Sequence, residues 1–359
     1  RVRALIPMQL HLFHQLLVQQ ESLEAGQKEI NQWLDDAEQL LGCLTLSGGK
    51  DSVQSQLDKH RTFFARTLYY KSMLDSKNKV FKNIIKSVDQ AGNIDTQEAN
   101  QKMQQINDRF SYVTQNAQIW EQKLQEAVRC WHNFRECERI ISDWLMKAEL
   151  LISEKHIDTK EIVESHKVFF ERVNERWIHD LVQTAQDLRN CLPSDQQRPI
   201  VNSVERLQAK WKEVLSFAPL HLMRLEFRLD ETTFQQYIKD IEKEINIEQQ
   251  AFNKQENVEA IIERNKEFFI SRGVVLEVEH CIQNMKKIAE SYSKWQPSDN
   301  SLNEAVNTIE HQWETIAQKV EHLRQQLHQI PAQWTNYHNK FEEMVKWMNL
   351  VDATLKNIM

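Results

Sequence analysis

Apolar side chains recur at alternating spacings of four and three residues along one long stretch of the chain, from Ala99 to Ile152. This spacing is typical of a helix that winds left-handedly against partner helices. Neither Gly nor Pro occurs between Asn93 and Leu192, so the stretch is predicted to be a single helix. Such a helix measures about 80 Å, more than one compact domain needs. We therefore expect it to end one helical bundle and begin the next.

Three sequence signatures return in a fixed order, which indicates an internal repeat of three helices. The first is Trp33-Leu34-x-x-Ala37-Glu38, which returns as Trp144-Leu145-x-x-Ala148-Glu149 and loosely as Trp347-Met348-x-x-Val351-Asp352. The second is His60-Arg61-x-Phe63-Phe64, which returns as His166-Lys167-x-Phe169-Phe170 and as Asn265-Lys266-x-Phe268-Phe269. The third is Ile106-x-x-x-Phe110, followed by Leu207-x-x-x-Trp211 and Ile309-x-x-x-Trp313.

Helix-breaking residues fall between these signatures, at Gly48-Gly49, Gly92, Pro193 to Pro199, and Pro297. Possible capping pairs stand beside them, with Asp51, Asp95 and Asp158 each three residues before a Gln or Glu. Helices are therefore predicted at about 9–43, 52–88, 96–153, 159–191, 197–252, 257–294 and 299–359.

Three-helix units that recur about every hundred residues, with Trp in the first helix and an aromatic residue in the third, resemble spectrin repeats. The resemblance implies an all-α fold of tandem left-handed three-helix bundles, joined by continuous linker helices into an elongated rod. It places the repeats at 9–119, 120–220 and 221–330, and makes 331–359 the first helix of a following repeat. The third repeat lacks the Trp of its first helix, and either Tyr237 or Ile245 takes that place.

Within this superfamily, the segments Trp131 to Cys137 and Trp211 to Pro219 are similar to the rod of a giant nesprin. That resemblance implies a location at the cytoplasmic face of the outer nuclear membrane and in the cytoskeleton. It also implies binding of actin and SUN-domain proteins by other parts of the parent, and of an actin-organising formin by the rod. Dystrophin-like and plakin-like proteins, which carry the same repeat, remain alternative parents.

Composition narrows the class of function. The net charge is −7, with 45 basic and 52 acidic residues, which argues against a nucleic-acid partner. No apolar run approaches the ~20 residues of a membrane span, so we expect no membrane insertion by this segment. The five cysteines include no CxxC pair and are expected to be reduced thiols in a cytosolic protein.

No motif of catalysis or of cofactor binding is complete. The Gly48-Gly49-Lys50-Asp51 stretch lacks the first Gly and the final Ser or Thr of a phosphate-binding loop, and is predicted to be a turn between helices. The 13 His form no close group with Cys, so His60 and His166 are interpreted as packed or capping residues rather than metal ligands. We expect no cofactor, no metal and no enzymatic activity.

Most of the ten Trp lie on or beside the apolar seams, which favours a structural role over a stacking platform for nucleic acid. The predicted structural core includes Trp33, Phe110, Trp120, Trp131, Trp144, Trp211, Trp313 and Trp347. Trp177 and Trp295 lie outside the traced seams and are predicted to be a core position or a lid over a loop rather than binding hot spots.

Two surfaces are candidate partner-binding sites. Four lysines share one face of the second helix of repeat 1, which is either a solvated face or a docking surface: Lys71, Lys79, Lys82 and Lys86. The hydrophobic register slips by one residue after Pro219, which predicts a bend between Pro219 and Phe234 or a silent change of repeat length. A bend would present Phe217, Leu220, Met223 and Phe227 to a partner.

The sequence therefore favours a non-enzymatic spacer and docking scaffold about 150 Å long that transmits tension. A lipid-surface or nucleic-acid binder is the contrasting class. The chain is expected to be a monomer, because each seam is used within its own bundle. The exception is 331–359, where an apolar stripe lacks bundle partners and invites self-association: Trp334, Tyr337, Phe341, Met344, Met348 and Val351.

Overall fold

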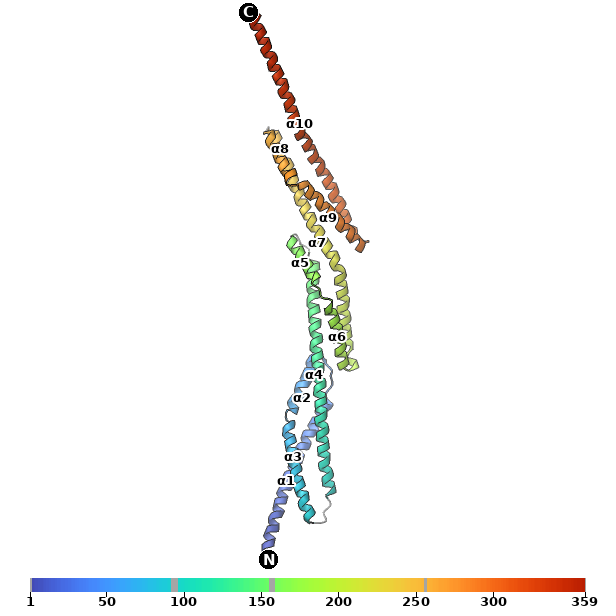
Figure 1. The fold of residues 1–359 in the computed structure, drawn as a ribbon. Helices are drawn as coiled ribbons and strands as arrows, with labels where there is room; N and C mark the ends of the chain where they lie inside the picture. The colour runs from blue at the N-terminus through green and yellow to red at the C-terminus, as the bar shows by residue number, and fades with distance from the viewer. Residues whose placement is uncertain (1, 92–95, 155–158, 255–256, 359) are drawn as a thin grey trace. The chain divides into compact units, whose positions relative to one another are not determined.

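The computed structural model describes residues 2–91, 96–154, 159–254 and 257–358, and every regular element among them is a helix (Figure 1). The all-α prediction is therefore confirmed. The elements are α1 (Val2–Gly42), α2 (Gly49–Phe64), α3 (Thr67–Ala91), α4 (Gln97–Ser153), α5 (Lys160–Glu171), α6 (Arg176–Cys191), the 3₁₀ turn Ser194–Gln196, α7 (Arg198–Asn253), α8 (Val258–Lys266), the π-helical turn Glu267–Ser271, α9 (Val274–Trp295) and α10 (Ser301–Ile358).

Three helices are long and continuous, as the unbroken seams predict. They are α4 with 57 residues, α7 with 56 and α10 with 58. The predicted repeat boundaries at 119/120, 220/221 and 330/331 lie inside these helices, so no loop separates one predicted repeat from the next. The chain divides into two compact units, residues 1–145 with 174–211, and residues 146–173 with 212–359.

The first unit contains a three-helix core in which α1 and α3 lie side by side with α4. Its buried side chains are Leu23, Ile30, Trp33, Leu34, Ala37, Leu74, Phe81, Met103, Ile106, Phe110 and Val113. Arg109 on α4 secures the rim of this core, because its guanidinium donates to Glu38 at 3.1 and 3.0 Å and to Asp35 at 2.8 Å on α1. These carboxylates raise the pKa of Arg109 further above its ordinary value.

A second set of buried residues in the first unit lies on α4, α6 and the beginning of α7. It is centred on Trp144 and Trp211, whose ring centroids are 4.8 Å apart. In the second unit, α5 packs on α7 through Val163 and Leu225. The remaining core of that unit joins α7, α8, α9 and α10, and includes Phe234, Ile241, Val278, Met285 and Ile309.

The second helix of each predicted repeat is broken, which corrects the three unbroken helices predicted at 52–88, 159–191 and 257–294. Each break follows the Phe pair of the second signature, at 65–66, 172–175 and 272–273. Local chemistry stabilises each one. The Thr67 hydroxyl donates to the Phe64 carbonyl at 2.7 Å, the Asn174 side chain accepts from the Arg176 amide at 3.0 Å, and Gly273 adopts φ 63°.

Two of the predicted capping residues lie outside the described residues, and the third is wrong. Asp51 does not cap its helix, since α2 begins at Gly49 after Gly48 in the left-handed region, with no side-chain cap. For α5 the cap is Thr159, whose hydroxyl accepts from the Ile162 amide. The two predicted capping residues that lie outside the described residues are Asp95 and Asp158.

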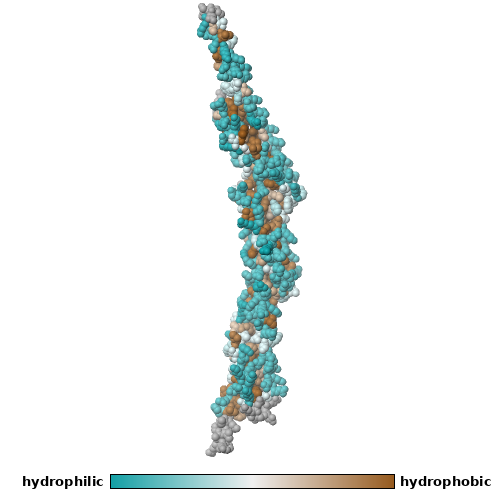
Figure 2. Space-filling view, in the orientation of Figure 1, coloured by the Kyte–Doolittle hydropathy of each residue, from teal (hydrophilic) through white to brown (hydrophobic). Residues whose placement is uncertain are grey.

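The C-terminal part of α10 exposes the apolar stripe that the sequence predicts. Exposed fractions are 60% for Trp334, 63% for Tyr337, 48% for Phe341 and 54% for Met344. Figure 2 shows hydrophobic patches on the surface of the C-terminal part of the chain, near the top of the view. Trp347 is 62% exposed, so its assignment to the structural core is wrong within this chain.

We predict that any concentration-dependent dimer forms through this stripe. Deleting 331–359 is expected to leave a monomer at every concentration, whereas the full chain gains mass as concentration rises, because burial of the stripe stabilises association. Multi-angle light scattering of the two chains measures the difference. A dimer that persists after the deletion would place the interface elsewhere.

Candidate docking groove and repeat junctions

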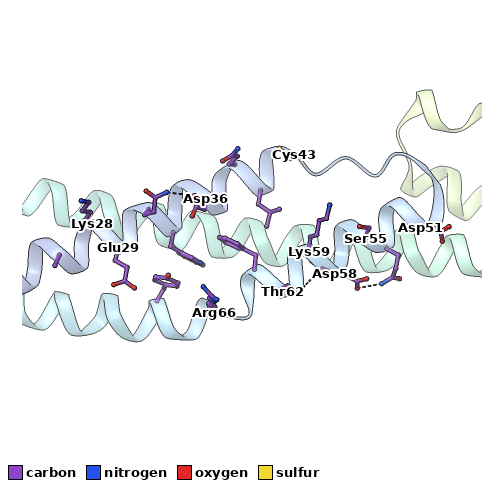
Figure 3. A pocket seen from close by; sticks show the side chains of 18 residues that line it. Lys28, Glu29, Asp36, Cys43, Asp51, Ser55, Asp58, Lys59, Thr62 and Arg66 are labelled. Atoms are coloured by element: carbon purple, nitrogen blue, oxygen red, sulfur yellow. Dashed lines mark hydrogen bonds between the residues drawn. The ribbon is translucent and has the colours of Figure 1, made fainter.

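A surface groove of about 1410 Å³ lies between α1, α2 and the beginning of α3 (Figure 3). It opens where the break at 65–66 separates α2 from α3, so the broken helix creates the hollow. The floor contains Trp33, whose ring is stacked on Tyr70 at a centroid distance of 4.8 Å and on Phe63 at 5.9 Å. Trp33 itself is buried, while Phe63 and Tyr70 are partly exposed.

The rim of the groove carries charges of both signs. Figure 3 shows Glu29, Asp36, Asp51 and Asp58 around the same hollow as Lys28, Lys59 and Arg66. An aromatic floor with a rim of mixed charge suits an amphipathic peptide or helix better than a nucleic-acid backbone, which needs a continuous basic surface. The sequence pattern does not indicate this groove, because the groove lies beside the unpredicted break after Phe64.

The four candidate lysines lie together on the exposed face of α3. Lys71 is paired with Asp75 at 3.4 Å, and its ammonium lies 5.9 Å from the centre of the Phe110 ring. The other three lysines of this face are Lys79, Lys82 and Lys86. The role of all four lysines as a partner-binding surface stays a prediction.

The predicted exposed patch after Pro219 is largely wrong. Phe217 is 50% exposed and Met223 is partly exposed, but Leu220 is 8% and Phe227 only 2% exposed. Helix α7 continues through Pro219, so it keeps these side chains on the face that packs in the second unit. The predicted bend is not tested and stays a prediction.

The structure buries most of the proposed core aromatics. Trp33, Phe110, Trp131, Trp144 and Trp211 are between 3% and 7% exposed. Two others are only partly buried, Trp120 on α4 and Trp313 on α10. Trp177 lies 6.4 Å from Trp211 between ring centroids, whereas Trp295 is 64% exposed.

Polar contacts join neighbouring predicted repeats, both between helices and between loops. In the first unit, Arg61 on α2 pairs with Glu121 on α4 at 3.1 Å, and the Gly48 amide donates to Gln196 at 3.4 Å. Gly48 precedes α2 and Gln196 lies between α6 and α7, so two bundles share this contact. The same unit brings the Cys130 and Cys191 sulfurs to 3.6 Å.

The corresponding junction in the second unit uses a different set of residues. Asp299 accepts from Arg224 at 2.7 Å, from the Tyr292 hydroxyl at 2.8 Å and from the Ser301 amide at 3.0 Å. The hydrogen bonds from Ser301, followed by those from Tyr292 and Arg224, lower the pKa of Asp299. Asp299 therefore holds the start of α10 against α9 and α7.

The two histidines of the second signature are packed in the interior, in agreement with the predicted packed or capping role. His60 and His166 are each 1% exposed. His166 Nδ1 lies 3.1 Å from Nε2 of the buried His221, and its Nε2 lies 3.3 Å from Glu154. Burial, followed by the interaction with the adjacent His166, lowers the pKa of His221 to about 4. At neutral pH His221 is therefore uncharged.

Comparisons with known proteins match the repeat pattern. Residues 237–357 match the family model of the spectrin repeats of nesprin-1. Over 358 residues the chain is 55% identical to Muscle-specific protein 300 kDa from Drosophila melanogaster. This match covers 100% of the chain but only 3% of the length of that protein. Over 259 residues it is 24% identical to microtubule-actin cross-linking factor 1, isoforms 6/7, from Mus musculus, covering 67% of the chain and 8% of that protein.

The chain belongs to the spectrin-repeat superfamily. Within it, residues 237–357 resemble the repeats of nesprin-1, and the chain is similar to small segments of giant cytoskeletal proteins. Among the described residues, no helix is both long and apolar enough to cross a membrane.

Proposed function

We propose that this spectrin-repeat segment is a non-enzymatic spacer and docking scaffold in a giant linker between the actin cytoskeleton and the nuclear envelope. The observation that carries the proposal is the continuity of α4, α7 and α10 through the predicted repeat boundaries. The 55% identity to Muscle-specific protein 300 kDa over the whole chain supports it.

The shared helices give a physical route for tension. A pull on one bundle acts on the backbone of the helix that also belongs to the next bundle, so the chain lengthens only when buried cores open. Cross-helix contacts such as Arg109 with Glu38 and Asp35 oppose the separation of helices within a bundle. The filled cores provide stiffness, in keeping with a mechanical rather than a catalytic role.

Docking is the second part of the proposal. The groove over Trp33, Phe63 and Tyr70 supplies a partly exposed aromatic floor and a rim of both charges, which suits an amphipathic helix. An actin-organising formin on the rod fits this role by family resemblance. Actin and SUN-domain proteins are expected to bind other parts of the parent, whose location is the cytoplasmic face of the outer nuclear membrane.

A tension sensor inserted into the parent protein next to this segment tests the proposed linkage. Energy transfer within the sensor is expected to be low in intact cells and to rise when actin filaments are depolymerised. A parent truncated directly after the sensor is the unloaded control. Equal energy transfer in the intact and truncated parents would contradict a load-bearing linker.

A plakin-like crosslinker is the second candidate, supported by the 24% identity to a microtubule-actin cross-linking factor. The same sensor separates the two candidates. Tension that falls when microtubules are depolymerised, and that persists when the nuclear-envelope anchor is removed, would favour the crosslinker.

A further inference from the structure

Two thiols that are distant in sequence meet at the junction of the first two predicted repeats. Cys130 lies in the middle of α4 and Cys191 is the last residue of α6, 61 positions further along the chain. Their sulfurs are 3.6 Å apart. This distance is van der Waals contact, and an approach of about 1.6 Å would bring the atoms to the 2.05 Å of a disulfide.

The surroundings of the pair favour a covalent link between the sulfurs over a bound metal ion. Glu126 lies beside Cys130, with its Oε1 accepting from the Cys130 thiol at 3.7 Å. Both oxygens of this carboxylate are already bound by Arg129, at 3.0 and 2.5 Å. A divalent cation at this cluster would lie close to the Arg129 charge and would compete for a ligand that Arg129 holds.

We propose that Cys130 and Cys191 form an oxidation-dependent disulfide that locks this junction. Cys191 can make the required movement because it ends its helix. The next residue, Leu192, has extended backbone angles of φ −107° and ψ 152°, as expected before Pro193. Cys130 is 4% exposed and fixed within α4, while Cys191 is partly exposed and reachable by a small oxidant.

A hydroperoxide such as hydrogen peroxide supplies the oxidising equivalents. The Cys191 thiolate attacks one peroxide oxygen, so that an S–O bond forms, the O–O bond breaks and hydroxide leaves. The Cys130 thiolate then attacks the resulting sulfenic acid at sulfur, so that the S–S bond forms and the S–O bond breaks. The two hydroxides take up the two thiol protons. Two thiols and one peroxide thus give a disulfide and two waters.

The reaction should be slow at neutral pH. Burial, and the adjacent Cys191 thiol, raise the pKa of Cys130 to about 12, so its thiolate is scarce. The rate of the step in which Cys130 attacks is therefore expected to rise about tenfold per pH unit between pH 7 and 9, as the fraction of Cys130 thiolate grows.

The cross-link would fix the end of α6 to α4. The turn that follows α6 carries Gln196, which accepts from the Gly48 amide of the preceding bundle, so the lock would also hold the loop that joins the two bundles. Cys130 and Cys191 are 61 positions apart. When the chain is pulled and unfolds, the disulfide would therefore prevent the segment between them from being stretched out. At 3.3–3.6 Å per residue the loss of extension is ~200 Å.

The test uses the full chain with Cys43→Ser, because Cys43 is exposed and would otherwise link separate molecules. The chain is treated with hydrogen peroxide, and free thiols are alkylated and mapped by mass spectrometry. We expect a peptide that links Cys130 to Cys191, with an unfolding temperature raised by ~5 °C and restored by reductant. Cys191→Ser removes both effects, whereas Cys281→Ser, at a buried thiol remote in sequence from the pair, retains them.

Three results would overturn the proposal. They are oxidation of Cys191 to a sulfinic acid without a link, a link that involves Cys137 instead, and stoichiometric zinc binding that needs both thiols and Glu126. The Cys191→Ser variant is essential because Cys130→Ser alters a buried position and could unfold the chain. The chemistry does not depend on whether the segment bears force, so its failure and the failure of the linker proposal are separable.

Discussion

Replacing Trp211 by alanine is expected to destabilise the first unit by ~3–5 kcal/mol. Trp211 is 4% exposed and contacts two further tryptophans, with ring centroids 4.8 Å from Trp144 and 6.4 Å from Trp177. Removal of the indole leaves a cavity that these rings cannot fill without moving α4 or α6. Because α4 and α7 continue beyond this core, we expect the loss of helix to extend into the adjoining parts of both helices.

Urea unfolding followed by circular dichroism measures the effect. Trp334→Ala is the matched control, since it removes the same side chain from a site that is 60% exposed, and it should change the free energy of unfolding by less than about 0.5 kcal/mol. Trp211→Phe should give an intermediate loss in a chain that still folds. Equal midpoints for Trp211→Ala and Trp334→Ala would refute the assignment of Trp211 to the core.

The second unit should lose stability as the pH rises through 7, because Glu248 on α7 is fully buried, with an exposed fraction of 0%. Its Oε2 accepts from the Asn265 amide at 3.0 Å, while its Oε1 has no hydrogen-bond partner among the described residues. Burial raises the pKa of Glu248 from 4.5 to about 7. The neutral acid is therefore the form that the folded chain favours.

The sign follows from proton linkage. The stability contributed by the protonated Glu248 is fully present below pH 4.5, the pKa in the unfolded chain, and is lost as the pH rises through about 7, the pKa in the folded chain. A shift of this size corresponds to about 3 kcal/mol between pH 4.5 and pH 8. Glu248→Gln keeps the shape of the neutral acid and should remove this dependence.

Paired urea titrations at several pH values isolate this group, since the other titrating residues are common to both chains. The difference in unfolding free energy between Glu248→Gln and the unmodified chain should grow from pH 5 to pH 8. Glu242→Gln, an exposed position on the same helix, should show no such growth. A pH-independent difference for Glu248→Gln would mean that the carboxyl is ionised throughout this range.

Features that depend on position along a helix could be predicted from the sequence. The seam of α4, the three returning signatures and the scarcity of Gly and Pro gave the all-α fold and the continuous helices. They also placed Trp33, Trp144 and Trp211 in the core, because a residue that repeats in register with a seam faces the partner helices. The exposed stripe of α10 followed from the same argument, since the seam continues past Pro331 without a facing helix among the described residues.

Features that depend on tertiary contacts were missed. The groove lies where α2 ends at Phe64. No Gly or Pro marks this break in the sequence, and the Thr67 hydroxyl stabilises it by donating to the Phe64 carbonyl. The Cys130–Cys191 contact joins positions 61 apart on different helices, and no spacing motif in the sequence indicates it. Leu220 was expected to be exposed because Pro219 suggested a distortion, but the helix continues and buries it.

Single-molecule extension of the chain, held at its two ends, tests the central claim most directly. If successive bundles bear load through shared helices, the chain should open in cooperative steps, each releasing at least one repeat of about a hundred residues, or ~350 Å. Some steps should release two neighbouring repeats together, because opening one bundle frays the helix that it shares with the next. Gradual lengthening without steps, or steps far shorter than one repeat, would contradict the account.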